Sequence, residues 1–559
     1  MEARDHVLIP RTARETTFHE GVAVAEIPAT QHAIQFTGVD QIVHNTAKAV
    51  DPVGPTQMLL QVEACGICFS DTKLLHAFDS HPRKAEVVSG IDLDALAEIP
   101  GYRPGSQPTV PGHEPVGRIV AVGDQVSRYS VGDRVLVQAD WKHLRTPKSN
   151  GAFGYNFEGA LQEYVVIDER CVISPSGEEF LIHVTDGPSA AAVGLIEPWA
   201  TVEGSYAWSE RNHLADGGRL LVVTENGGTG VEALTADHQP GETSTVAPAD
   251  VASLEGQTFD DIIYFGADAD VIEALTPLLG TRATFCVVLG GQRIQRKVKL
   301  DIGRVHYDFI RFVGTVGDDP ADAYAWVPAT GEVRDGDRVA IIGAAGPMGQ
   351  MHTIRAVTSG IGIASVDATD LSDDRLSHLA ALVQPVADEK GIPITFINTG
   401  NTELQPGYTH ISCMVPVPAL VSQAVDLAAD GAILNAFAGI PAGTLGDFDL
   451  QGIIERRIFM LGTSGSDVSD MRTVLDKIEK GVIDTHISLD AVTGMAGFTD
   501  AIESVMNRTS GGKIMVYPML HDLGLTRLVD MPEKLPHVAA KLNDGVWTKE
   551  AEAALLAGE

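Results

Sequence analysis

The hydrophobic pattern of the N-terminal part predicts short β-strands. Apolar positions recur in AIQFTGVD, QIVHN and QMLLQVEAC within residues 31–65, which Pro and Gly interrupt at 52, 54 and 55. Residues 110–137 repeat the pattern, with Gly-Asp turns at 123–124 and 132–133. We expect a small all-β unit here, followed after Ser189 by the helical segment AAAVGLIEPWATVEGSYAW.

After Gly217 the pattern changes to an alternation of strands and helices. The short apolar runs RLLVV, DDIIYF and TFCVVL are typical of buried parallel strands, and ADADVIEALTPLL between the last two has a helical period. A second block begins at Arg338 with RVAIIG and continues through ASVDATD, HISCMVP, PALVSQAVDLAA and AILNAFAG. The pattern predicts two α/β units in tandem.

The two units look like a duplication. The tripeptide Tyr-Ala-Trp precedes each first strand, at 206–208 and at 324–326, and FVGTVGDD from Phe312 resembles MLGTSGSD from Met460. The copies are unequal, because the first has the short, irregular turn TENGGTG where the second has a full phosphate-type turn. The rest of the chain reads as a turn, a helix and a strand, followed by a helical tail of about forty residues without assigned chemistry.

Composition and charge exclude several classes of protein. The chain has 559 residues, of which 44% are hydrophobic and 21% charged, which excludes a disordered or fibrous chain. Forty basic against 75 acidic residues give a net charge of −35, which argues against nucleic acid or an anionic membrane as partner. Five cysteines cannot form a disulfide scaffold. The first thirty residues show no signal peptide, and no apolar run reaches membrane-spanning length, so we expect a cytoplasmic protein.

Three separate segments offer metal-ligand chemistry. Cys65 and Cys68 flank Gly-Ile, His113 and Glu114 lie in PGHEP, and Glu197 lies in the apolar helix of IEPW. Singly, these residues are explained equally well by a redox pair or buried thiols, a structural histidine, and a carboxylate with a buried partner. Together they supply the S, N and O donors of a zinc site with an open position.

The order G-I-C-x-S-D, G-H-E, V-G-D-x-V, E-P and a Rossmann block resembles the zinc-dependent medium-chain dehydrogenases. The Glu-Pro ligand is similar to the sorbitol-dehydrogenase branch. GYNFEGALQEY at 154–164, the GPMG turn and MLGTSGSD at 460–467 most resemble L-sorbose-1-phosphate reductase-like proteins. The resemblance covers nearly all of residues 31–520 apart from the extra block.

The resemblance implies a site and a division of the chain. It implies Cys68 rather than Cys65 as the thiolate ligand, His113 as the imidazole ligand, and Glu114 and Glu197 as carboxylates near one catalytic zinc, the bound one depending on the state. A GroES-like β-rich catalytic domain of residues 1–215, completed by 467–520, would precede a degenerate Rossmann-like domain (216–317), an NAD-binding Rossmann domain (318–466) and a tail (521–559).

Two further residues have roles implied by the same motif. Ser70 matches the hydroxyl that passes the substrate proton outward, and Asp71 matches the carboxylate that orients the ligand histidine. A local turn cap is the alternative for Ser70. The chain departs from many relatives in lacking cysteines for a structural zinc after the G-D-x-V strand. It also carries Lys73 where the alcohol-dehydrogenase branch has a relay histidine, which leaves the proton path beyond Ser70 open.

The second α/β unit carries the coenzyme signature. The turn GAAGPMG runs from a strand into a helix, where glycines let a pyrophosphate approach the helix N-terminus. Asp370 ends the next strand, where a carboxylate accepts hydrogen bonds from the adenosine ribose and repels a 2′-phosphate, so we favour NAD. Arg375 beside that ribose position leaves NADP open. The expected coenzyme-binding residues are Ala345, Gly346, Pro347, Met348, Gly349, Asp370 and Arg375.

The first unit lacks this set, and Asp237 reads as a surface acid rather than a ribose ligand. We interpret this unit as a scaffold or interface domain, with a second nucleotide site as the less favoured alternative.

These features predict hydride transfer between NAD(H) and a secondary alcohol or ketone, with a polyol, sugar or sugar phosphate as substrate and a homo-oligomeric assembly. The cations after Cys68 could meet a substrate phosphate or lie in a solvated loop; they are Lys73, His76, Arg83 and Lys84. Two rival functions are a zinc-free reductase of the quinone-oxidoreductase kind and a non-catalytic scaffold.

Overall fold

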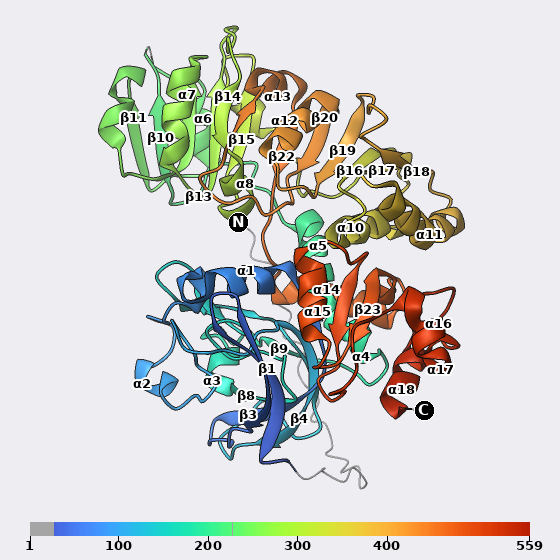
Figure 1. Cartoon of the computed structure of the whole chain (residues 1–559). Helices are drawn as coiled ribbons and strands as arrows, with labels where there is room; N and C mark the ends of the chain where they lie inside the picture. The colour runs from blue at the N-terminus through green and yellow to red at the C-terminus, as the bar shows by residue number, and fades with distance from the viewer. Residues whose placement is uncertain (1–26, 226, 559) are drawn as a thin grey trace.

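The computed structural model of the chain describes residues 27–225 and 227–558. The expectation of no signal peptide concerns residues 1–30 and therefore falls almost wholly outside this part. Figure 1 shows two lobes: a lower lobe formed by the N-terminal and C-terminal parts of the chain, and an upper lobe formed by the middle.

The lower lobe is built on a largely antiparallel sheet of order β25-β23-β24-β3-β4-β5-β9, and β8 also pairs with β3. Its strands are β3 (Gln57–Ile67), β4 (Glu114–Val122), β5 (Arg134–Val137), β8 (Tyr164–Asp168), β9 (Leu181–His183), β23 (Leu489–Thr493), β24 (Lys513–Val516) and β25 (Thr526–Arg527). Two hairpins accompany the sheet, β1 (Thr30–Gly38) with β2 (Gln41–Ala49) and β6 (Asp140–Arg145) with β7 (Asn150–Ala152).

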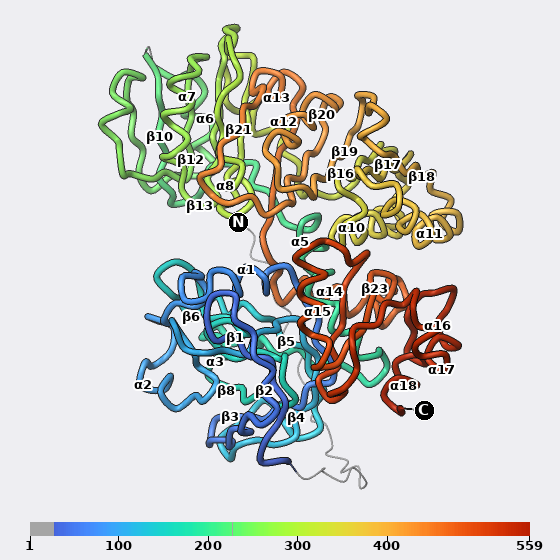
Figure 2. Tube along the Cα trace, in the orientation of Figure 1, coloured from blue at the N-terminus to red at the C-terminus, as the bar shows by residue number. Residues whose placement is uncertain are grey.

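The C-terminal part of the chain completes this sheet. Ile514 of β24 pairs antiparallel with Ile67 of β3, so the two ends of the sequence meet beside the segment that holds Cys68. Figure 2 shows the red C-terminal trace returning next to the blue N-terminal one. Helix α1 (Phe69–Ala77) begins directly after β3, and α15 (Phe498–Met506) packs against it.

Helix α5 (Ile196–Ala207) connects the two lobes. The predicted single helix after Ser189 is broken at Leu195 into α4 (Ala190–Gly194) and α5. Helix α5 packs on α10 (Pro347–Thr358) and on α14 (Val468–Glu479). A buried ion pair fixes this contact: the Arg355 guanidinium of α10 lies 3.0 Å from Glu203 of α5, which Lys477 of α14 also contacts at 2.6 Å.

The tail packs onto the lower lobe. It contains the two-residue strand β25 and the short helices α16 (Met531–Lys534), α17 (Pro536–Ala539) and α18 (Lys549–Ala557). Trp547 is fully buried. The buried Glu552 carboxylate accepts the N–H groups of Ala190 (2.6 Å) and Ala191 (2.7 Å) at the start of α4, and the Tyr517 hydroxyl at 2.9 Å. The tail thus satisfies donors that the end of α4 leaves without a helical partner.

The upper lobe contains two parallel sheets, as the alternating pattern predicts. The first has the order β11-β10-β12-β13-β15 and the second β18-β17-β16-β19-β20-β22. The first sheet comprises β10 (Arg219–Val223), β11 (Glu242–Val246), β12 (Phe259–Phe265), β13 (Leu279–Val288) and β15 (Arg311–Thr315). The second comprises β16 (Arg338–Ile342), β17 (Ser365–Asp370), β18 (Ile394–Asn398), β19 (Tyr408–Cys413), β20 (Ala428–Asn435) and β22 (Phe459–Leu461).

The two sheets meet about a pseudo-twofold axis. β14 (Val298–Asp301) and β21 (Leu445–Phe448), which hold matching places in the two units, pair antiparallel with each other. Each is followed by a short helix, α8 (Ile302–Tyr307) or α13 (Leu450–Arg456), and then by a left-handed residue, Phe309 (φ 56°) or Arg457 (φ 54°). The matching order supports the duplication expected from the sequence.

Reciprocal contacts across this axis strengthen the symmetry. A Cβ added at Gly314 of β15 would lie 2.7 Å from Ile454 of α13, and one added at the matching Gly462 would lie 3.0 Å from His306 of α8. These glycines belong to the repeated strings FVGTVGDD and MLGTSGSD. Each unit therefore receives a helix of the other, as in an isologous dimer interface, but within one chain.

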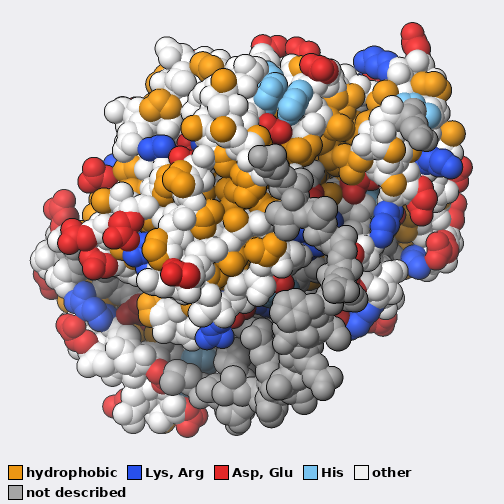
Figure 3. Space-filling view, turned by 90° about the horizontal axis from the view of Figure 1, so that it is seen from below, with side chains coloured by type: hydrophobic (Ala, Val, Ile, Leu, Met, Phe, Trp, Pro, Cys, Tyr) orange, Lys and Arg blue, Asp and Glu red, His pale blue; other side chains and the backbone are white. Residues whose placement is uncertain are grey.

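Within the described part, no helix is both long and apolar enough to cross a membrane. Seen from below, apolar side chains form a band across the middle of the molecule, and many acidic side chains lie toward its rim (Figure 3).

Replacing Glu552 with Ala should lower the free energy of unfolding by about 2–3 kcal/mol, because two buried N–H groups lose a charged acceptor. Urea unfolding followed by tryptophan fluorescence measures this loss, with the exposed Glu550→Ala on the same helix as control. Equal stability of the two variants would contradict the proposed docking of the tail.

Candidate active site

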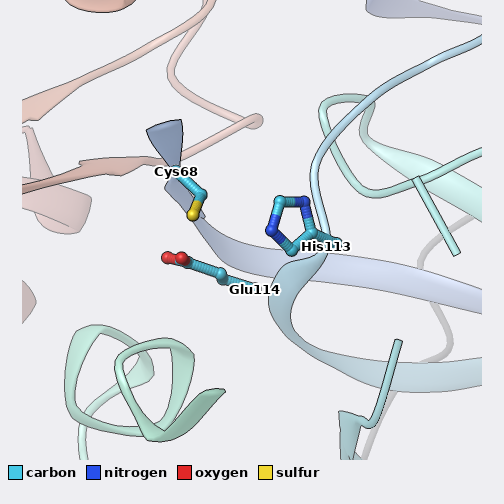
Figure 4. Close-up of side chains that lie close together, drawn as sticks. All are labelled: Cys68, His113 and Glu114. Atoms are coloured by element: carbon cyan, nitrogen blue, oxygen red, sulfur yellow. The ribbon is translucent and has the colours of Figure 1, made fainter. Parts of the chain in front are cut away.

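Cys68, His113 and Glu114 converge in the lower lobe. Their Sγ, imidazole nitrogen and carboxylate oxygen all lie within 4.8 Å of one another, and Figure 4 shows the sulfur facing the space beside the carboxylate and the ring. The sheet register explains this, because Gly66 of β3 lies opposite Glu114 of β4. A Cβ at Gly66 would lie 2.1 Å from Glu114 Oε2, so the glycine leaves room for the carboxylate.

Asp71 ties the sulfur and imidazole donors together. One carboxylate oxygen lies 3.1 Å from His113 Nδ1, and the other accepts the Cys68 N–H at 2.9 Å. A proton on Nδ1, held by the carboxylate, leaves the Nε2 lone pair for another partner. Asp71 is wholly buried, so this arrangement is shielded from water.

Glu114 has a buried partner that sequence reasoning missed. Lys513, the first residue of β24, donates to Glu114 Oε1 at 2.6 Å and to the Ile67 carbonyl at 2.9 Å. Burial lowers the pKa of Lys513, but Glu114, Cys68 and Glu197 together outweigh burial and raise it, so the lysine stays charged. Glu114 Oε2 is buried and has no hydrogen-bond partner. The only signal in the sequence was a lone lysine at the start of the apolar strand KIMV.

Glu197 lies near this group without joining it. It is the second residue of α5 and is not among the residues whose donor atoms lie within 4.8 Å of one another. Burial, and next the charge of Glu114, raise the pKa of Glu197 to about 7. Two neighbouring carboxylates, one fully buried and one half-buried, favour a cation between them.

Ser70 and Tyr155 also border His113, Ser70 at the Nε2 that Asp71 leaves free. The Ser70 hydroxyl lies 3.0 Å from His113 Nε2, and the buried Tyr155 ring lies 5.5 Å from the imidazole, centre to centre. Burial raises the pKa of Tyr155, opposed in part by a hydrogen bond with Ser70. Tyr155 belongs to the motif GYNFEGALQEY, but the sequence alone did not single it out.

The four cations considered for a substrate phosphate separate into two pairs. Lys84 is buried and donates to the Arg103 and Gln107 carbonyls, and His76 pairs with Asp40 at 2.5 Å, so both have structural partners. Arg83 and Lys73 remain near the site. Arg83 lies over the Tyr155 ring at 5.2 Å and pairs with Asp140 at 2.9 Å.

A second group with metal-ligand side chains lies in the first α/β unit: His213, Asp216 and His238. The two imidazole rings stack with centroids 3.8 Å apart and planes 14° apart. In-plane nitrogen lone pairs of stacked rings run side by side instead of converging, which suits a tetrahedral ion poorly.

The glycine-rich turn of the second unit has the form of a phosphate site. It connects β16 to α10, whose N-cap is Gly346. A Cβ at Gly349 would lie 2.2 Å from the Gly343 carbonyl, so only glycine lets the helix approach the turn this closely. The N-terminus of α10 points its N–H groups and partial positive charge at this turn.

Asp370 and Arg375 lie together beside the turn. Asp370 Oδ2 accepts the Ala345 N–H at 3.3 Å and lies 3.7 Å from the Arg375 guanidinium. Arg375 Nε is buried with no hydrogen-bond partner, and a Cβ at Gly346 would lie 3.3 Å from Arg375 Nη2. Asp370 and Arg375 thus lie beside the glycine-rich turn before α10, which we call the coenzyme cradle. The Arg375 Nε is a hydrogen-bond donor without a partner there.

The turn after the first strand of the first unit is not short, as the sequence suggested. β10 ends at Val223 and α6 (Val231–Asp237) begins at Val231, so this turn is longer, not shorter, than the one between Ile342 and Pro347. The short element is the helix α6. The Phe265 ring lies against Gly228, 2.3 Å from where a Cβ would be.

The ends of the strands carry different residues in the first unit. By sheet register Ala247 occupies the place that Asp370 has in the second unit. A cavity of about 410 Å³ remains at the carboxyl ends of β10 and β12, and its lining includes Glu225, Asp268 and Asp318 but neither lysine nor arginine. Because these carboxylates have no lysine or arginine beside them in the lining, they would repel the negative charge of a pyrophosphate.

Helix α1, which begins directly after Cys68, reaches the second unit. Lys73 of α1 extends to the loop after β20, where its Nζ lies 3.6 Å from the position of a Cβ on Gly439. This loop follows the carboxyl end of a central strand, the side on which a Rossmann fold binds its ligand.

Comparisons with known proteins agree with this architecture. Residues 54–176 match the family "Alcohol dehydrogenase GroES-like domain". The chain is 31% identical to D-altritol 5-dehydrogenase of Agrobacterium fabrum over 289 residues, which cover 47% of this chain and 78% of the relative. It is 27% identical to mannitol-1-phosphate 5-dehydrogenase of Aliivibrio fischeri over 254 residues, which cover 40% of this chain and only 57% of that relative.

A solved structure shows the same fold. The 2R,3R-butanediol dehydrogenase of Bacillus subtilis matches with a TM-score of 0.52 at 16% identity, covering 88% of this chain and all of the other. The chain belongs to the medium-chain dehydrogenase/reductase superfamily, in its alcohol-dehydrogenase-like part. The expected superfamily and fold class are confirmed, whereas the L-sorbose-1-phosphate reductase-like branch stays a prediction.

Replacing Lys513 with Met should cost about 3–5 kcal/mol of unfolding free energy, because Glu114 would keep a buried charge without its partner. Chemical unfolding in a chelating buffer measures this cost. Lys480→Met removes an exposed pair with Asp476 and should change stability by less than about 0.5 kcal/mol. A loss below 1 kcal/mol for Lys513→Met would contradict the buried pair.

Proposed function

We propose that the protein is a zinc-dependent oxidoreductase that transfers a hydride between NAD(P)(H) and a secondary alcohol or ketone. The observation that carries the proposal is the buried meeting of a thiol, an imidazole and a carboxylate oxygen that lacks a partner. This is the donor set that zinc prefers, and an ion there would satisfy Glu114 Oε2 and relieve the crowding with Glu197.

Cys68, His113 and Glu114 would hold one zinc, with Glu197 as the alternative carboxylate. When bound, zinc supplies Lewis-acid polarisation of a substrate oxygen, and the nicotinamide supplies a hydride acceptor. Asp71 keeps the proton on His113 Nδ1 and positions the Cys68 backbone. Ser70 carries the substrate proton at its Oγ, and the neighbouring Tyr155 hydroxyl is the next group in reach.

The coenzyme would occupy the second unit. Its pyrophosphate fits the turn Ala345-Gly346-Pro347-Met348-Gly349, and Asp370 would accept the adenosine ribose hydroxyls. Asp370 favours NAD, while Arg375, with its unsatisfied Nε, keeps NADP open. The same proposal assigns 1–215 with 467–520 to the catalytic domain, 318–466 to coenzyme binding, 216–317 to a degenerate unit and 521–559 to the tail.

The substrate class we propose is a polyol, sugar or sugar phosphate. The named relatives act on D-altritol and on mannitol 1-phosphate, which agrees with this class without choosing between them. A zinc-free reductase would not need the buried thiol–imidazole–carboxylate group, and a scaffold would not need the coenzyme cradle.

Elemental analysis should find one zinc per chain. Cys68→Ser should remove most of it and lower NAD⁺ reduction with D-altritol or mannitol 1-phosphate by roughly a hundredfold or more, because a ligand of the ion is lost. His238→Ala is the matched control, since it removes an imidazole from the stacked group and should leave the zinc content unchanged. Zinc near zero in the wild type would favour the zinc-free alternative.

Asp370→Ala should shift coenzyme use toward NADP. Removing the carboxylate frees Arg375 and ends the repulsion of a 2′-phosphate, so the ratio of kcat/KM for NADP⁺ over NAD⁺ should rise roughly ten- to a hundredfold. Asp373→Ala, on the first turn of α11 (Asp373–Lys390), is the control. An unchanged ratio would exclude Asp370 as the ribose-binding residue.

A further inference from the structure

A buried group of charges joins α5 to α10, the two helices that begin beside the proposed zinc site and at the coenzyme cradle. Arg355, in the last turn of α10, donates to Glu203 of α5 at 3.0 and 3.3 Å and to Glu332, in the segment before β16, at 2.8 and 2.7 Å. Lys477 of α14 donates to the same Glu203 at 2.6 Å. Arg355 and Glu203 are both more than nine-tenths buried. We call these four residues the helix clamp.

Further contacts between the same two helices support the helix clamp. The Arg355 guanidinium lies over the Tyr206 ring of α5, 3.8 Å from its centre, and the Tyr206 hydroxyl lies 2.8 Å from Nδ1 of His352 in α10. Burial, and next the charge of Arg355, lower the pKa of His352, so this ring is neutral. Burial raises the pKa of Glu203, but Arg355 and Lys477 outweigh burial and lower it, so this carboxylate stays charged. The helix clamp therefore consists of charged groups whose hydrogen bonds fix their directions.

Side-chain packing alone does not fix this contact. A cavity of about 100 Å³ lies beside the helix clamp, and its lining includes Thr358 and Ser359 near the end of α10 and Val482 and Ile483 after α14. In a densely packed interface the shapes of the side chains determine how two helices cross, whereas here directional charged hydrogen bonds border an open space. The crossing of α5 and α10 thus depends on Arg355 more than on close packing.

We propose that Arg355 is a positioning residue that sets the separation between the proposed zinc site and the nicotinamide of the bound coenzyme. Helix α5 has Glu197 as its second residue, beside the proposed zinc site, and α10 begins after its N-cap Gly346 in the coenzyme cradle. The helix clamp joins the two helices farther along their lengths, so it fixes the angle between their first turns. This inference rests on the proposed function and adds a residue to it.

The lengths of the two helices make this angle important. A helix rises about 1.5 Å per residue, so Arg355, nine residues after Gly346, lies roughly 13.5 Å from it along the axis. A tilt of about 5° at the helix clamp would move the coenzyme cradle by about 1 Å. Reacting atoms must lie about 3–3.5 Å apart, and an error of about 1 Å can lower the rate about a hundredfold. Loss of the helix clamp should therefore affect hydride transfer more than the binding of zinc or coenzyme.

Gln350, in the first turn of α10, is a weaker link between the lobes. Its Nε2 donates to the Gly511 carbonyl in the loop before β24, and its Oε1 is buried without a hydrogen-bond partner. One neutral hydrogen bond to a loop holds a helix less firmly than the four charged hydrogen bonds that Arg355 donates. The positioning role therefore falls to Arg355.

The kinetic test compares Arg355→Met with the wild type in the oxidation of D-altritol and mannitol 1-phosphate. The variant should lower kcat about ten- to a hundredfold, while zinc content and affinity for NADH change less than about twofold, because each binding site stays intact. The isotope effect on kcat, measured with the alcohol deuterated at the oxidised carbon, should rise because hydride transfer becomes the slowest step. Arg355→Lys should lie between the two, since an ammonium cannot bridge both glutamates as a guanidinium does.

Two further variants complete the kinetic test. Glu332→Gln keeps Arg355 and its pair with Glu203, so it preserves the buried part of the helix clamp and should lower kcat about two- to tenfold. Arg293→Met is the control, because it removes an arginine whose side chain is 65% exposed from a pair with Glu455 and should leave kcat unchanged.

The distance between the lobes gives a readout that does not need turnover. Spin labels introduced by Glu389→Cys on α11 and Glu550→Cys on α18 report this distance in a Cys68→Ser background, where the other four cysteines are buried. Arg355→Met should broaden the distance distribution, because the angle between the lobes is no longer fixed, and Arg293→Met should not.

An unchanged kcat in Arg355→Met, or a fall in kcat matched by equal losses of bound zinc and of affinity for NADH, would overturn the positioning role. If the wild type oxidises neither polyol, the proposed reaction fails. The distance distribution then tests the helix clamp by itself: broadening in Arg355→Met supports it, and an unchanged distribution overturns it.

Discussion

The buried carboxylate of Asp71 is the interaction on which the site depends. It holds the backbone of Cys68 and the ring of His113 at once, although Cys68 directly follows β3 and His113 directly precedes β4. A fully buried carboxyl group is stable only when its hydrogen bonds are met, so moving either donor would leave one of its oxygens without a partner. The β3–β4 register and the space at Gly66 then bring Glu114 to the same point, and the closing strand β24 supplies Lys513.

The sequence predicted the parts whose signals are local. Short motifs singled out Cys68, His113, Asp71 and the turn before α10, and periodicity predicted the strands and helices of both α/β units. Lys513 and Tyr155 were missed because their contacts depend on pairing between distant segments, which no local pattern records. Lys84 and His76 follow Cys68 closely in the sequence and were therefore candidates for binding a substrate phosphate. In the structure their side chains instead contact a backbone carbonyl and the Asp40 carboxylate, which the local sequence does not indicate.

The duplication shows how far two copies of one pattern can diverge while the frame stays the same. Both units keep the strand order around the first strand, the helix after the antiparallel strand and the left-handed residue that ends it. What differs is the chemistry at the strand ends: Asp370 against Ala247, and an open turn against one covered by Phe265. The second unit has the glycine-rich turn suited to an anion, whereas the first unit lacks it. Both units keep the surface through which they contact each other.

The pseudo-twofold contact through β14 and β21 joins segments of a single polypeptide. Two separate subunits joined in this way would come apart on dilution, whereas tethered partners meet at an effective concentration that dilution does not change, commonly in the millimolar range. The pairing of the α/β units in this chain is therefore independent of how much protein is present. A substitution in one α/β unit also leaves the other unit unchanged, whereas in a dimer of identical subunits it would appear on both sides. The two units can therefore acquire different functions.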